Sequence, residues 1–182
     1  MLTIDFARLP CSIHAETSLE SVAQACGISR TTLFSYFPAK SEILLYGDER
    51  NVERVSALLH DAPFDLPVGV VLRKAARTMR PVPANAREEL AVYWRILDEN
   101  SDVAAQARAM GQRYARIIAD FVAVRLGTEP SDSMPALLGE TVPAALLAAA
   151  RHWTVHAEPG VPLEEALENA VDPLITAYLG TL

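Results

Sequence analysis

Cysteine is scarce in this chain of 182 residues, which contains only Cys11 and Cys26. Two cysteines form neither a disulfide framework nor a zinc signature, so a reducing cytoplasm is the simplest setting for the protein. Positive charge is also in short supply, because the formal net charge is −7 at pH 7. The molecule as a whole therefore does not attract nucleic acid or an anionic membrane, and any DNA contact must come from a local patch.

Long apolar runs and strand-like alternation are missing as well. No run approaches the ~20 apolar residues that a membrane span needs, and the start "MLTIDFARLPCS" does not resemble a secretory signal. We therefore expect no membrane partner. Hydrophobic residues still make up 51% of the sequence, which is enough to build a core.

Apolar residues recur every three or four positions along most of the chain, which is the helical period. We expect about nine helices, one of them before Thr17 and the others over 17–26, 29–37, 40–59, 67–80, 85–98, 102–126, 133–157 and 162–180. Gly127 is placed to end a helix in the left-handed conformation, and Pro173 should kink or break the last helix. The predicted fold is all-α, with one domain over 1–46 and a second over 47–182.

The stretch "TSLESVAQACGISRTTLFSYFPAKSEIL", residues 17 to 44, has the features of a helix-turn-helix. Thr17 and Glu20 have the spacing of a capping box at the start of the first short helix. Gly27 permits the positive φ of a tight turn, and Ser29 can cap the second helix. An ordinary helix end followed by a solvated polar face is the simpler alternative, but it does not require the aromatic cluster, Pro38 or the following lysine.

The second short helix has an outward face that suits the major groove of DNA. Arg30 can bind guanine with a bidentate fork, and Thr31 and Thr32 can contact bases. Tyr36, Lys40 and Thr17 are better placed for phosphates, which set register and affinity. The predicted DNA-binding residues are Thr17, Ser29, Arg30, Thr31, Thr32, Ser35, Tyr36 and Lys40.

This stretch resembles the DNA-binding signature of TetR-family transcriptional regulators. The matching features are the Thr17 cap, Ala23 with Gly27, the Ser29 cap, the "FSYF" cluster and Lys40. The segments "SYFPAK" and "ILDEN" are further similar to an actinobacterial subgroup that includes mycofactocin-system regulators. The resemblance implies that the later helices form a ligand pocket and that the last two pair with a second copy. It also implies that a ligand moves the helix beginning at Lys40 and so changes the spacing of the two recognition helices.

The residues before Thr17 depart from the family pattern. Pro10 interrupts the segment that should form the first helix, and the usual glycine before the threonine cap is absent. Residues 1–46 carry three Lys or Arg against four Asp or Glu, a net charge of −1. We expect a short or degenerate first helix, either natively or because translation begins further upstream, and weak operator binding. A relative with weak or no DNA binding, acting as a helical small-molecule-binding dimer, is the alternative function.

The second domain offers candidates for an effector site and a dimer interface. An apolar stripe along 102–126 includes Val103, Met110, Tyr114 and Val124; its simplest role is core packing, but a thioether and a phenol also suit a pocket. The predicted small-molecule contacts are Tyr93, Trp94, Met110, Tyr114 and Trp153. The last two helices, rich in Ala and Leu, suit a symmetric homodimer interface, with a buried monomer core as the alternative.

Metal and enzyme chemistry find little support in the sequence. His152 and His156 share a helix face, but no third strong ligand has suitable spacing, so we predict no metal site and no cofactor. We find no nucleophile–base pair and no phosphate loop, and therefore predict no enzymatic activity. The leading interpretation is a cytoplasmic, ligand-responsive repressor that binds an operator as a homodimer.

Overall fold

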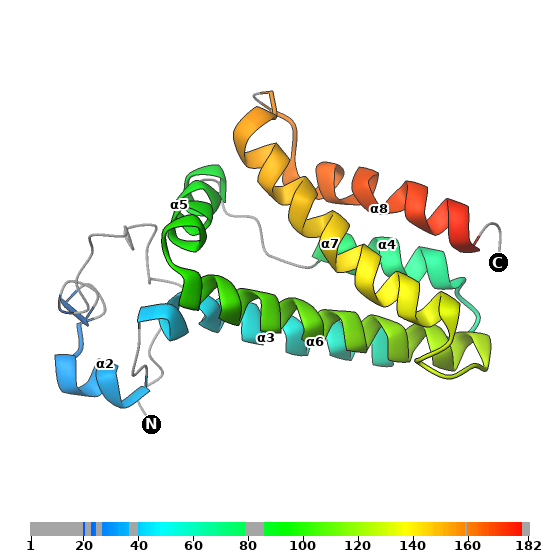
Figure 1. Ribbon diagram of the computed structural model, residues 1–182, viewed down its shortest axis with the longest axis horizontal. Coiled ribbons are helices and arrows are strands. Elements are labelled where there is room, and N and C mark those ends of the chain that lie inside the picture. The colour runs from blue at the N-terminus through cyan, green and yellow to red at the C-terminus, as the bar shows by residue number, and fades with distance from the viewer. Residues whose placement is uncertain are drawn as a thin grey trace.

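A computed structural model describes residues 20, 23–24, 27–36, 40–78, 86–158 and 160–179, and the side chains of 36, 40–48 and 78 are not among those described. Every regular element in these ranges is a helix (Figure 1). The helices are α2 (Arg30–Tyr36), α3 (Lys40–His60), α4 (Val68–Thr78), α5 (Ala86–Glu99), α6 (Ser101–Leu126), α7 (Ser133–His156) and α8 (Leu163–Leu179). The all-α prediction is confirmed, while the predicted helix before Thr17 lies outside the described residues.

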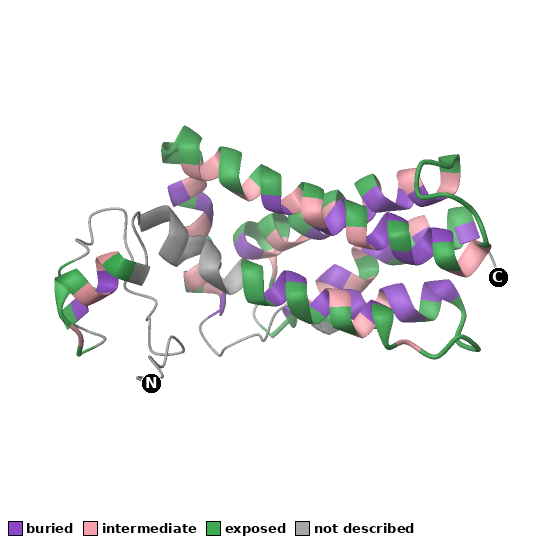
Figure 2. Cartoon of the chain, turned by 90° about the horizontal axis from the view of Figure 1, so that it is seen from below, coloured by how far each residue is buried: buried purple, intermediate pink, exposed green. Residues whose placement is uncertain are grey.

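The long helices form a layered body, and α2 lies at one end of it (Figure 1). α3 and α6 run side by side, α7 crosses α6, and α8 covers α7 and α4. Their shared core includes Leu72, Val122, Leu138 and Val171, which are all almost fully buried. Figure 2 shows buried positions along the inner sides of these helices and exposed positions along the outer sides. The core is therefore continuous across the long helices.

Two glycines allow helices to cross closely in this body. A Cβ atom on Gly139 of α7 would lie 2.6 Å from the Ala115 carbonyl oxygen of α6. A Cβ atom on Gly69 of α4 would lie 2.6 Å from a methyl carbon of Ile175 in α8. Both distances are shorter than real Cβ contacts, so the absence of a side chain sets how closely each helix pair packs.

Two arginines bind carbonyl oxygens of segments that lie far away in the sequence. Arg125 of α6 donates four hydrogen bonds of 2.8 to 3.1 Å to carbonyls between residues 62 and 66, in the loop after α3. Its guanidinium also lies over the rings of Phe64 and Phe121, at 4.7 and 5.0 Å from their centroids. Arg87 of α5 donates to carbonyls at the end of α7, including that of Ala157 at 2.5 Å. Arg87 thus satisfies carbonyl oxygens at a helix end, and Arg125 satisfies those of a loop that follows a helix.

Several local predictions can be compared with the structure. Gly127 ends α6 with φ of 66°, in the left-handed conformation, as predicted. Pro173 does not break the last helix, because α8 continues from Leu163 to Leu179. Pro173 is exposed, and its neighbours Val171 and Ile175 are buried, so packing on both sides maintains the helix despite one missing hydrogen bond. Val124 does not belong to the predicted buried stripe, because its side chain is 64% exposed.

One described helix, α7, is long and apolar enough to cross a membrane by length and composition, a feature that the search for long apolar runs did not detect. Its most apolar window has a mean hydropathy of 1.3, and 28% of that window is buried. However, α7 packs against α5, α6 and α8 and contributes Leu138, Val142 and Leu146 to the core. We therefore assign α7 to the helical body.

Candidate nucleic-acid interface and effector region

The turn before α2 has the geometry that the sequence predicted. Gly27 has φ of 66°, and its amide donates to the Gln24 carbonyl at 3.1 Å. The Ile28 amide donates to the Ala23 carbonyl at 3.0 Å, which closes the preceding helical turn. Ala23 and Leu33 are 2% and 1% exposed, so they form the buried side of the turn. With that side fixed, the opposite side of α2 faces outward.

Hydrogen bonds from side chains hold the start of α2. The Ser29 hydroxyl accepts from the Thr32 amide at 3.1 Å, which confirms the predicted cap. The Ser29 and Thr32 hydroxyls also lie 2.8 Å apart, and the Ser35 hydroxyl donates to the Thr32 carbonyl at 2.8 Å. Ser29, Thr32 and Ser35, three of the predicted DNA contacts, therefore already form hydrogen bonds within the recognition segment. Thr31 is exposed at the same end of α2.

Arg30, the predicted guanine-binding residue, has two partners within the recognition segment. Its Nη1 lies 2.7 Å from Oε1 of Glu20, and its guanidinium carbon lies 5.1 Å from the centroid of the Phe34 ring. The Glu20 carboxylate lies against Arg30, while the capping box predicted for Thr17 and Glu20 depends on Thr17, which falls outside the described residues. The side chains of Thr17, Tyr36 and Lys40 lie outside the described residues.

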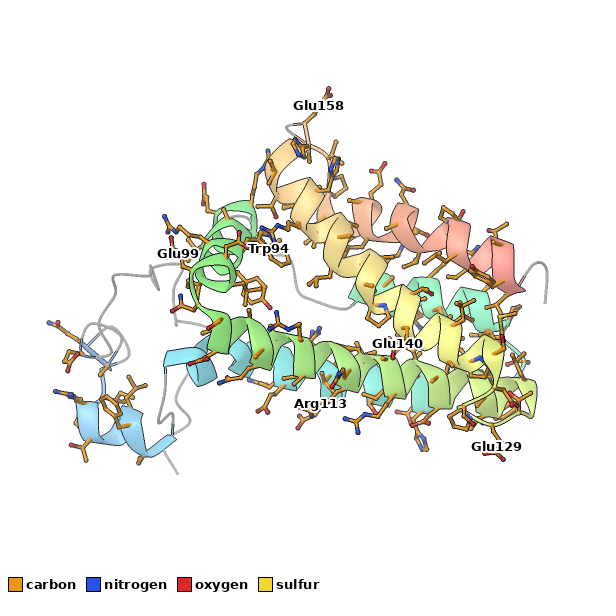
Figure 3. All side chains as sticks on the ribbon, in the orientation of Figure 1. Trp94, Glu99, Arg113, Glu129, Glu140 and Glu158 are labelled. Atoms are coloured by element: carbon orange, nitrogen blue, oxygen red, sulfur yellow. The ribbon has the colours of Figure 1, made fainter. Side chains whose placement is uncertain are left out.

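The predicted effector contacts lie together around the core of the long helices. Trp94, Met110 and Tyr114 are buried, whereas Tyr93 and Trp153 are partly buried against the same cluster. Trp94 of α5 points toward α7 (Figure 3), where its Nε1 donates to the Thr154 hydroxyl at 3.1 Å. All five belong to the core cluster or pack against it, and the described side chains around them pack as core.

One polar contact in this region was missed by sequence reasoning. The Asn51 side chain of α3 is buried, and its Nδ2 donates to the Tyr114 hydroxyl of α6 at 2.9 Å. A buried amide on an otherwise apolar helix face is the signal that could have identified it. The contact joins the helix that begins at Lys40 to the proposed effector region.

The structure also contains a groove that the sequence did not predict. It lies between α3 and α6 and has a volume of about 740 Å³. Figure 3 shows Arg113, one of its lining residues, on the side of α6 next to α3. Its lining residues are Val52, Glu53, Ser56, Ala57, His60, Asp61, Arg113, Arg116, Ile117 and Asp120. None of the predicted effector contacts is among them, so the groove and the predicted effector region are separate places.

His152 and His156 lie together on the exposed side of α7, with their ring centroids 4.7 Å apart. Within the described residues, no group of three or more His, Cys, Asp or Glu side chains is arranged to hold a metal ion. The pair therefore lacks a third protein ligand in this part of the chain.

Comparisons with known proteins identify the class. Residues 15–46 match the tetR family of bacterial regulatory proteins, and residues 66–178 match the MftR C-terminal domain. The second match covers more than half of the chain. The protein belongs to the TetR family of DNA-binding transcriptional regulators, which is not a family of enzymes. Within that family it carries an MftR-type C-terminal domain, so the predicted resemblance is confirmed at both levels.

Individual relatives agree with this assignment. A Mycobacterium tuberculosis H37Rv protein named as the mycofactocin biosynthesis transcriptional regulator MftR is 27% identical over 157 residues, which are 86% of this chain and 78% of that protein. FadR from Thermus thermophilus, a TetR-family repressor solved in complex with lauroyl-CoA, is 26% identical, with a TM-score of 0.60 over 92% of this chain and 86% of that one. A TetR-family regulator from Mesorhizobium loti MAFF303099 has a TM-score of 0.64 at 17% identity over 95% of this chain and 92% of that one, a likeness of fold alone.

Proposed function

We propose that this regulator is a ligand-responsive repressor that acts in the cytoplasm as a homodimer on double-stranded operator DNA. The observation that carries the proposal is the capped helix α2, which lies within the family match and exposes Arg30 and Thr31. Two such helices, one from each copy, would enter successive major grooves. Arg30, Thr31 and Thr32 would contact bases, while Thr17, Ser29, Ser35, Tyr36 and Lys40 would fix the register.

The dimer would form through α7 and α8. Leu147 and Val155 of α7 are 56% and 64% exposed, and Tyr178 of α8 is 38% exposed. Ala144 and Ala148 lie on the same exposed side of α7 and allow a second helix to approach closely. An apolar face of this kind calls for a partner, and a second copy supplies the same face by symmetry.

The effector would be an acyl-CoA or a compound with a similar acyl chain. The support is FadR, whose structure holds lauroyl-CoA and whose sequence is 26% identical to this chain. The acyl chain of the effector would enter among Tyr93, Trp94, Met110, Tyr114 and Trp153, where apolar and aromatic side chains gather. Its entry would require these packed side chains to rearrange.

The signal would travel through α3. Tyr114 contacts Asn51, and α3 runs without interruption from His60 back to Lys40, next to the DNA-binding segment. We place the boundary between domains 1–46 and 47–182 within this helix. An acyl chain that displaces Tyr114 would remove the buried bond to Asn51, shift α3 and change the separation of the two recognition helices.

The test begins with selection of bound DNA from a random pool, because each later binding measurement needs the operator sequence. The selected site is then used in a gel shift with lauroyl-CoA, with free CoA as the control. We expect lauroyl-CoA to release the DNA at concentrations where CoA has no effect. Tyr114→Phe, which removes the bond to Asn51 without a ligand, should bind this DNA more weakly than the wild type and respond less to lauroyl-CoA. DNA binding that ignores lauroyl-CoA would reject this effector class, and a monomer in sedimentation would reject the dimer.

A helical small-molecule-binding dimer with weak or no DNA binding is the second candidate. Two observations favour it: residues 1–46 have a net charge of −1, and Glu20 already neutralises Arg30. The salt dependence of binding separates the two functions, because a DNA-binding regulator releases counterions in proportion to its phosphate contacts. Nanomolar operator binding at physiological salt would remove the second candidate.

A further inference from the structure

We infer that Glu20 determines specificity at the recognition surface by holding the Arg30 guanidinium in position for one guanine. The inference rests on the proposed DNA-binding function of α2. It starts from two contacts: the 2.7 Å ion pair between Glu20 Oε1 and Arg30 Nη1, and the 5.1 Å approach of the guanidinium to the Phe34 ring. Glu20 precedes the turn, whereas Arg30 and Phe34 lie one helical turn apart on α2.

The two contacts restrict the guanidinium in different directions. Phe34 covers one face of the planar group, and Glu20 binds one nitrogen at its rim. A guanidinium has five N–H donors, and a monodentate ion pair through Nη1 leaves the Nε and Nη2 edge available. That edge supplies the two parallel donors that guanine O6 and N7 accept. The pair with Glu20 is therefore compatible with guanine recognition.

The same restriction would discriminate against other contacts. An unrestrained arginine can turn toward a phosphate, and such a contact adds affinity for DNA of any sequence. A guanidinium fixed by Glu20 cannot make that turn without losing its ion pair. The Glu20 carboxylate also repels the phosphate backbone, which weakens binding to every sequence alike. Glu20 should thus lower the overall affinity and raise the preference for guanine at one position.

The alternative role for Glu20 is that of a competitor, whose carboxylate binds Arg30 in place of guanine. If Glu20 only occupied Arg30 in the free protein, DNA would have to break the ion pair before guanine could bind. Removing the carboxylate would then raise affinity for the guanine site at least as much as for other sites. The two roles therefore predict opposite changes in discrimination, although both predict tighter binding to DNA of unrelated sequence.

The experiment measures discrimination with the full chain. A bound sequence is selected from a random pool, and competition assays compare it with variants changed at each base pair. The proteins are the wild type, Arg30→Ala, Glu20→Gln and Glu20→Asp, which keeps the charge but shortens the reach. Glu53→Gln is the matched control, because Glu53 is exposed in the groove between α3 and α6 and its replacement changes the net charge equally. Circular dichroism verifies that each variant is folded.

We expect Arg30→Ala to reduce discrimination at one guanine by roughly 10-fold or more. Glu20→Gln and Glu20→Asp should reduce it at the same position by about 3- to 10-fold, as a partial loss of the same contact. Glu53→Gln should leave it unchanged.

Unchanged or increased discrimination in Glu20→Gln, with a loss in Arg30→Ala, would overturn this inference and leave the proposed function intact. No effect from Arg30→Ala, or no DNA binding by the wild type, would overturn the proposed role of Arg30 and this inference together.

Discussion

Between residues 20 and 36, the described side chains include two buried apolar residues, Ala23 and Leu33, and neither joins the core cluster of the later helices. From Val52 to Leu179, by contrast, buried residues of all six helices from α3 to α8 form one continuous cluster, to which α5 contributes Leu90 and Trp94. Among the described residues, the recognition segment shows local hydrogen bonds and the burial of Ala23 and Leu33, whereas the helical body shows one extensive core. A recognition helix whose buried residues lie apart from the core of the body could move while the body keeps its structure.

The largest expected effect comes from the core of the body. Leu138 of α7 is 0% exposed, so Leu138→Ala should lower the free energy of unfolding by about 2 to 5 kcal/mol. Leu33→Ala removes the same atoms from α2, where Leu33 is 1% exposed. We expect this variant to lose DNA binding with a smaller change in the main urea transition. Equal losses of stability in the two variants would contradict the separation of the regions and show one cooperative unit.

The crossing of α6 and α7 gives the next largest effect. Gly139→Ala would place a Cβ atom 2.6 Å from the Ala115 carbonyl oxygen and 3.0 Å from the Ala119 Cβ, so the helices must separate. Overpacking of this kind costs about 1 to 3 kcal/mol, measurable by urea unfolding. Gly111→Ala is the control, because a Cβ atom there meets nothing within 4 Å. That variant should be stabilised by up to about 1 kcal/mol, since alanine favours helix. A neutral Gly139→Ala would show that the crossing tolerates a methyl group.

The helices and the recognition turn could be predicted because their causes are local in sequence. Spacing of apolar residues predicted α3 to α8 with boundaries close to those observed, and Gly27 and Ser29 predicted a turn and a cap that depend on neighbouring residues. One failure is instructive: Val124 follows the apolar spacing of the stripe, but the packing of α6 leaves its side chain 64% exposed, outside the core.

Contacts between distant segments could not be predicted, because they depend on how the helices are placed. Arg125 of α6, for example, binds the loop after α3, more than 60 residues away in the sequence. Two further features exist only because α3 and α6 pack side by side: the Asn51–Tyr114 hydrogen bond and the groove between the two helices. The Glu20–Arg30 pair joins residues on either side of the turn, so it too depends on how α2 lies against the preceding segment.

The cap of α2 gives a smaller effect that should be confined to the recognition segment. Ser29→Ala removes the acceptor for the Thr32 amide and should cost about 1 kcal/mol of local helix stability. Faster hydrogen exchange at Thr32 and Leu33 and weaker DNA binding would report this loss, with no shift in the main unfolding transition. Ser101→Ala is the control, because Ser101 is exposed at the first position of α6, where the N-cap residue Asn100 makes no capping hydrogen bond. Unchanged exchange in Ser29→Ala would mean that tertiary contacts, and not the cap, hold α2.

The smallest effect on stability should come from Glu20→Gln. The Glu20 and Arg30 side chains are 51% and 63% exposed, and ion pairs this exposed contribute about 0 to 1 kcal/mol. The comparison in the body is Asp172→Asn, which removes the 2.6 Å pair between α8 and Arg73 of α4, whose side chain is 29% exposed. We expect the second variant to lose more stability in urea unfolding, because that pair joins two helices of the body and is better shielded from water. If Glu20→Gln instead lowered stability by several kcal/mol, the carboxylate would be a structural element of the turn. With stability unchanged, any loss of guanine discrimination in Glu20→Gln must arise at the DNA surface, which is what a positioning role for Glu20 requires.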